Sequence, residues 1–73
     1  MVPPIESQKR LLYFIRAYGE VTMGQIREFV RKCELDFGLG VGTIDVLVSD
    51  QALGKIEIDI DKGRARSLEF KDS

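Results

Sequence analysis

The sequence predicts a small α+β domain in which three helices are followed by a two-stranded β-hairpin. Apolar residues recur at helical spacing in three segments of residues 1–53, and strict alternation replaces that spacing from Ile56 onward. At 73 residues the chain has room for one domain and no second. A hydrophobic content of 44% with a net charge of -1 is typical of a chain that folds.

The first helix is expected over about residues 7–18, after an extended N-terminal segment of residues 1–6 that contains two prolines. Ser7 is the candidate N-cap, and Gly19 ends the helix. The apolar face between them consists of Leu11, Leu12, Phe14, Ile15 and Tyr18.

The second helix has the clearest start signal of the sequence. Thr22 and Gln25 have the spacing of a capping box, in which each side chain bonds the backbone amide of the other residue, so a helix is predicted to begin at Met23. The β-prone residues 20–22 favour a short strand just before it. The inward face is expected to hold Met23, Ile26, Phe29, Val30 and Cys33.

A loop is predicted over residues 34–42, where helical spacing fails and three glycines occur. The third helix is expected from Val41 or Thr43 to Leu53, followed by Gly54 as the stop signal. We expect Val41, Ile44, Leu47 and Val48 to face inward, and Thr43, Asp45, Val46, Ser49 and Asp50 to face the solvent.

The hairpin consists of two alternating segments, residues 56–61 and 64–71, with residues 71–73 as a tail. A two-residue loop would place the apolar residues of the second strand on the opposite face from the isoleucines of the first. A three-residue loop, 61–63, with Gly63 in the left-handed conformation avoids this conflict and is preferred. It pairs Ile60 with Arg64, Ile58 with Arg66 and Ile56 with Leu68, and directs Ile56, Ile58, Ile60, Leu68 and Phe70 toward the core.

This order of elements resembles the winged helix-turn-helix family over nearly the whole chain. The resemblance is carried by Gly19-Glu20-Val21-Thr22 before the capped helix, by Leu53-Gly54-Lys55-Ile56-Glu57-Ile58 at the start of the hairpin, and by Gly63-Arg64-Ala65-Arg66 at its tip. The family resemblance implies a third helix that enters the major groove of DNA and a hairpin, the wing, that contacts phosphates or the minor groove.

Two features depart from that family pattern. The connection over about residues 34–40 is longer than in a tight helix-turn-helix. The third helix also exposes two carboxylates and carries no Lys or Arg between Val41 and Leu53, which disfavours contact with a polyanion. Positive charge lies elsewhere, since residues 1–40 have a net charge of +1 and residues 41–73 have -2.

DNA binding is the function that the resemblance predicts, with double-stranded DNA as the partner of a small transcriptional regulator. The expected DNA-binding residues come from three places: Lys62, Arg64 and Arg66 at the wing tip, Arg27, Arg31 and Lys32 on the second helix, and Thr43 and Ser49 on the third. The alternative is a protein-interaction module of a larger replication, transcription or secretion machine, which the acidity of the third helix favours.

The first helix offers a possible binding surface for a second copy of the chain or for another protein. Tyr13 points away from its apolar face, and with Val2, Ile5 and part of Phe14 it could form an apolar patch. The alternative is that the N-terminal segment folds over Tyr13.

Catalysis and metal binding are not expected. The chain has no His, and its one Cys excludes an internal disulfide and a multi-thiolate zinc site, so we predict no enzyme activity, no cofactor and no metal. The glycines at positions 38, 40 and 42 lack the spacing of a phosphate-binding loop. Without a membrane-spanning or signal segment, the expected location is cytoplasmic, with no membrane partner.

Overall fold

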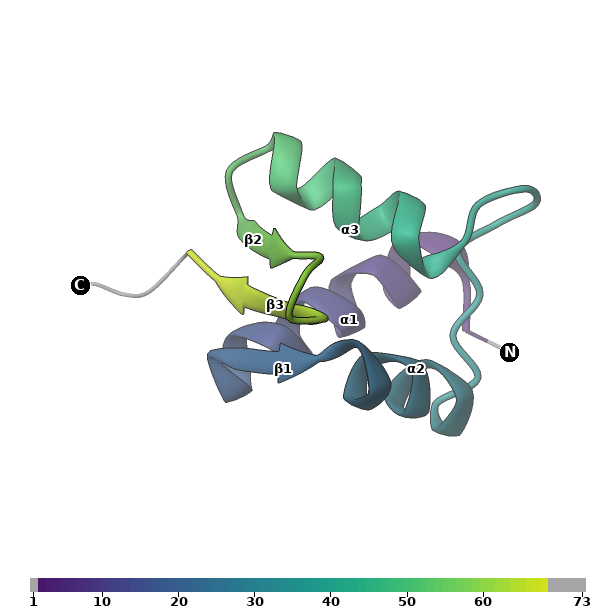
Figure 1. Ribbon diagram of the computed structural model, residues 1–73. Helices are drawn as coiled ribbons and strands as arrows, with labels where there is room; N and C mark the ends of the chain where they lie inside the picture. The colour runs from purple at the N-terminus through teal and green to yellow at the C-terminus, as the bar shows by residue number, and fades with distance from the viewer. Residues whose placement is uncertain (1, 69–73) are drawn as a thin grey trace.

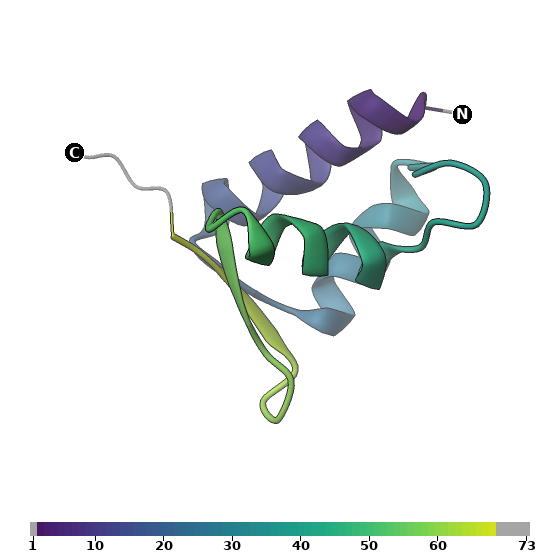
Figure 2. The ribbon, with the colours of Figure 1, turned by 90° about the horizontal axis from the view of Figure 1, so that it is seen from above.

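Over residues 2–68, the part of the chain that the computed structural model describes, three helices accompany a three-stranded antiparallel sheet (Figure 1). The elements are α1 (Pro4–Tyr18), β1 (Glu20–Thr22), α2 (Met23–Lys32), α3 (Thr43–Ala52), β2 (Ile56–Asp59) and β3 (Arg64–Ser67). The strand order is β1-β3-β2, and the β2–β3 hairpin, called the wing below, projects away from the helices (Figure 2). The predicted α+β class is confirmed, and the arrangement is consistent with a winged-helix fold.

The core lies where the three helices meet one face of the sheet. Helix α1 packs against β1 and β3, and α3 packs against β2. Each described element contributes at least one buried residue, and the loop before α3 contributes Phe37; the buried apolar set is Leu11, Ile15, Val21, Ile26, Phe37, Val46, Leu47, Ile56 and Ala65.

The start of α2 is as the sequence predicts. The Thr22 hydroxyl oxygen accepts a hydrogen bond from the Gln25 amide at 3.1 Å, and the Gln25 side-chain oxygen accepts one from the Thr22 amide at 2.8 Å. The predicted short strand is β1, which ends at Thr22 and pairs with β3. One residue therefore closes a strand and caps a helix.

Replacing Thr22 with Ala is expected to lower the free energy of unfolding by about 1 kcal/mol, because it removes the hydroxyl that satisfies an amide of the first turn of α2. Urea denaturation followed by circular dichroism measures the loss. Thr22→Ser keeps the hydroxyl and serves as the control. Equal stability of the Ala variant and the parent would contradict the capping role.

Helix α1 begins three residues earlier than predicted, and the assignment of Ser7 as its N-cap is wrong. Pro4 occupies the first turn, where the missing amide hydrogen costs nothing, so residues 1–6 are not all extended. Ser7 is instead fully buried: its hydroxyl donates to the Val2 carbonyl at 3.1 Å and accepts from the Asp36 amide at 2.9 Å. This side chain joins the N-terminal segment to the loop before α3.

Helix α3 is rotated relative to the predicted orientation. Val46, expected at the surface, is buried beside Leu47, whereas Val41, Ile44 and Val48, expected in the core, are exposed. The cause is an excess of apolar residues, which occupy positions all around this helix and leave its inward face undetermined by spacing alone. Contact with the sheet selects the face that contains Val46 and Leu47.

The predicted hairpin register is wrong by one residue. Ile58 pairs with Ala65 and Asp59 with Arg64, so the loop has four residues, 60–63, instead of three. The Lys62 amide donates to the Asp59 carboxylate at 3.2 Å, and Gly63 adopts the predicted left-handed conformation with φ of +65°. These turn bonds favour the longer loop.

The new register changes which residues of the wing are inside. Val21, Ile58 and Ala65 form a row across the three described strands on the inner face. Ile60 falls in the loop and is exposed, and Leu68 follows β3 and is exposed as well, so neither occupies the predicted core position. The predictions for Phe70 and for the tail 71–73 lie outside the described residues.

Candidate functional site

The three basic residues of the wing lie together, but acidic residues share their surface. Arg64 and Arg66 are on the outer face of β3, and Lys62 is in the hairpin loop. Together they line one shallow depression of about 220 Å³ with three carboxylates, those of Glu20, Glu57 and Asp59. The formal charges of this surface cancel.

Both arginines of the wing are engaged in ion pairs. Arg64 lies 3.6 Å from the carboxylate of Glu20, and Arg66 pairs with Glu57, its direct neighbour across the sheet. Opposite charges in such cross-strand positions stabilise a sheet modestly. Because both pairs are about half exposed, they contribute little to stability and phosphate could compete for the arginines.

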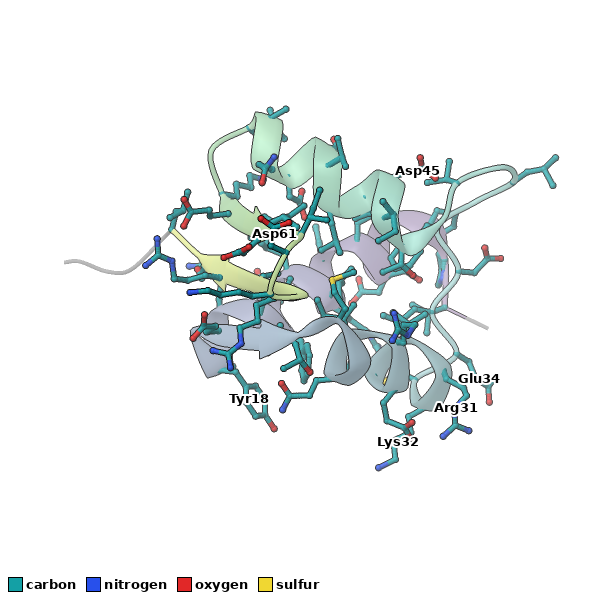
Figure 3. All side chains as sticks on the ribbon, in the orientation of Figure 1. Tyr18, Arg31, Lys32, Glu34, Asp45 and Asp61 are labelled. Atoms are coloured by element: carbon teal, nitrogen blue, oxygen red, sulfur yellow. The ribbon has the colours of Figure 1, made fainter. Side chains whose placement is uncertain are left out.

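The other predicted DNA-binding residues do not join the wing cluster. Arg31 and Lys32 lie at the C-terminal end of α2, away from β3 (Figure 3), and Arg31 pairs with Glu28. Arg27 is exposed on the same helix. Thr43 is the half-buried first residue of α3, and Ser49 is exposed in its second half. The eight residues therefore do not form one continuous basic surface.

A different surface stands out between α3 and the wing. It is a groove of about 280 Å³ whose exposed lining is almost entirely apolar, and we call it the α3–wing groove; its residues are Met23, Ile44, Val48, Gln51, Ile58, Ile60 and Gly63. Ile44 is 56% exposed, Val48 53% and Ile60 86%. Large apolar side chains that are this exposed and gathered in one groove make it a candidate partner-binding surface.

Hydrogen bonds hold the walls of this groove in place. The Ile58 amide, on the outer edge of β2, donates to the side-chain oxygen of Gln51 at 2.7 Å, which ties the wing to α3. The Met23 amide donates to the carbonyl of Gly63 at 2.7 Å, which ties the hairpin loop to the start of α2. These two bonds join α3, the wing and the start of α2, which together line the groove.

Acidic side chains lie beside the groove. Three carboxylates, those of Glu57, Asp59 and Asp61, line a depression that shares two of its lining residues with the groove. Asp45 lies near the N-terminal end of α3 and Asp61 lies on the hairpin (Figure 3). Asp45 also accepts a hydrogen bond from the Gly42 amide at 2.8 Å, which closes the first turn of α3. An apolar groove with an acidic surround is chemically suited to protein and poorly suited to DNA.

The sequence analysis did not identify this groove because it placed Ile44, Val48 and Ile60 in the core. The available signal was the number of apolar residues: a ten-residue helix on the surface of a small domain needs one apolar face, and α3 has more than one. A surplus of this kind predicts an interface even when the inward face is unknown.

The patch predicted around Tyr13 is only partly present. Tyr13 and Ile5 are exposed, but Phe14 is half buried and stacks on Phe29 with ring centroids 4.2 Å apart. Val2 is half buried, and its amide donates to the Glu34 carbonyl at 3.3 Å. The α3–wing groove is therefore the better candidate for a partner surface.

Among residues 2–68, no helix is long and apolar enough to cross a membrane, and no group of three or more His, Cys, Asp or Glu side chains could hold a metal ion. Cys33, the single thiol, is half buried at the end of α2. Comparison of the chain with protein-family models, with curated proteins and with solved structures found no match.

Proposed function

We propose that this chain is a protein-interaction module with a winged-helix architecture, and that it docks on its partner through the α3–wing groove. The observation that carries the proposal is the groove itself: Ile44 and Val48, on the helix that the family resemblance assigns to DNA, and Ile60, on the hairpin loop, leave their apolar surface exposed. Helix α3 has no Lys or Arg to offer a phosphate. A protein partner would cover this surface and gain the free energy of apolar burial.

Site-specific crosslinking tests the docking proposal. A photoreactive phenylalanine analogue replaces Val48 inside the groove, and a matched variant carries it at Leu39, which is fully exposed in the loop before α3. We expect one discrete protein adduct from position 48 and none from position 39. Mass spectrometry identifies the adduct, and the purified partner is then titrated against the parent chain and Val48→Lys. The proposal requires binding to the parent and its loss in the variant; the same adducts from both positions, or equal binding, would refute it.

DNA binding through the wing is the second proposal, and it rests on the cations that remain available. Arg27, Lys32 and Lys62 have no ion pair among the described residues, and the pairs of Arg64 and Arg66 are exposed enough to exchange for phosphate. In this arrangement the wing contacts the backbone of double-stranded DNA, and α3 faces away.

Replacing Lys62, Arg64 and Arg66 together with Ala is expected to reduce the slope of log affinity against log salt by about two to three units, because each phosphate contact releases roughly one counterion. Binding isotherms with mixed duplex DNA at several salt concentrations measure the slope, and circular dichroism confirms folding. The matched control is Lys9→Ala with Arg10→Ala on α1. An unchanged slope would remove the wing from the DNA site, and a parent chain that does not bind duplex at low salt would end the DNA proposal.

A further inference from the structure

We infer that the partner segment which occupies the α3–wing groove is a basic amphipathic helix, an inference that rests on the proposed docking function. Its apolar face would contact Ile44, Val48 and Ile60, and its Lys and Arg side chains would lie against the acidic surround of the groove. Helix-in-groove docking of this kind uses apolar anchors spaced three or four residues apart.

Charge determines which partners can approach this surface. The carboxylates of Glu57, Asp59 and Asp61 line a depression that adjoins the groove, and Asp61, on the hairpin next to Ile60, has no hydrogen bond or ion pair among the described residues. Two copies of the chain docked through the same face would bring like charges together, which costs free energy. A partner rich in Lys and Arg gains from the same field.

The backbone of β2 determines the form of the partner segment. An extended peptide binds a sheet edge through main-chain hydrogen bonds, and β2 is the edge strand next to the groove. The Ile58 amide on that edge already donates to Gln51 at 2.7 Å, so α3 blocks strand addition at the groove. A helix satisfies its own backbone groups and needs from the groove only apolar contact for a few side chains.

Three synthetic helical peptides of about 15 residues provide the test. They share one apolar face of Leu residues, and their remaining positions are Lys and Arg in the first, Gln in the second and Glu in the third. Each is titrated into the ¹⁵N-labelled full chain at two salt concentrations. We expect the basic peptide to shift the amides of Ile44, Val48, Ile58 and Ile60, to bind about tenfold more tightly than the acidic one, and to weaken as salt rises.

Asp61→Asn removes one acidic group from the surround and should weaken binding of the basic peptide by about threefold. Its matched control is Glu34→Gln, an exposed residue near the end of α2 that lies far from Asp61 (Figure 3). Both substitutions are at exposed sites and conserve shape, so folding should persist.

The outcomes separate this inference from the docking function on which it rests. If all three peptides bound the groove with equal affinity, the inference of a basic partner would be contradicted, and the proposed docking function would still hold. Concentration-dependent dimerisation with shifts at the same amides would overturn it in favour of a second copy. Shifts confined to other surfaces, or no binding by any peptide, would count against both the inference and the proposed function.

Discussion

Replacing Phe37 with Ala is expected to unfold most of the population at room temperature. Phe37 is 6% exposed and packs in the core, although it lies in a segment without helix or strand. Truncation of a buried Phe costs about 3–5 kcal/mol, through lost transfer free energy and the cavity left behind. A domain of this size has a total stability of only about 3–5 kcal/mol, so the loss is comparable to the whole.

Leu39→Ala is the matched control, because Leu39 lies two residues away in the same loop and is fully exposed. Its stability should stay within about 0.5 kcal/mol of the parent. Thermal and urea denaturation followed by circular dichroism compare the two variants. Similar stability of both would mean that the loop does not deliver Phe37 to the core.

The second large effect is expected on α3, where Val46→Asp should unfold the domain and Val48→Asp should be tolerated. Val46 is 4% exposed, so a carboxylate there loses its hydration without gaining a partner, at a cost above about 3 kcal/mol. Val48 is 53% exposed and its replacement remains in contact with water. The two substitutions are chemically identical, which makes their difference a direct measure of how α3 is oriented.

This pair of variants also tests the premise of the proposed function. Free energies of unfolding from urea denaturation should differ between them by more than about 2 kcal/mol. If Val48→Asp were the more damaging variant, α3 would present the face expected from spacing alone, and the apolar α3–wing groove would not exist. A folded Val48→Asp chain is then available as a docking-deficient variant.

Local signals explain which elements could be predicted. The start of α2 depends on Thr22 and Gln25, which lie three residues apart and need no other part of the chain to form the capping box. The strand before it, the end of α1 at Gly19 and the left-handed Gly63 are equally local. These local features predict the order of elements and, with it, the α+β class, and the structure confirms both.

The wrong predictions all concern a choice between two nearly equivalent arrangements. Spacing in α3 permits more than one inward face, because apolar residues surround the helix. Alternation in residues 56–61 does not say where the strand ends, and one residue of register moves Ile60 from the core to the surface. Ser7 has the residue type of an N-cap, but a proline at the first turn makes the helix start earlier.

Patterns within the sequence were enough to predict the α+β class, the order of elements, the capping box of α2 and a third helix without basic residues. They were not enough to predict which apolar residues are buried, because burial depends on the sheet that α3 meets and on the pairing of Ala65 with Ile58 and Val21. The candidate site depends on these contacts: Ile44 and Val48 lie one turn apart on α3, and Ile60 joins them only when the wing folds beside that helix. Composition predicts that most apolar side chains are buried, but long-range contacts determine which of them remain exposed on the surface, where a partner can bind them.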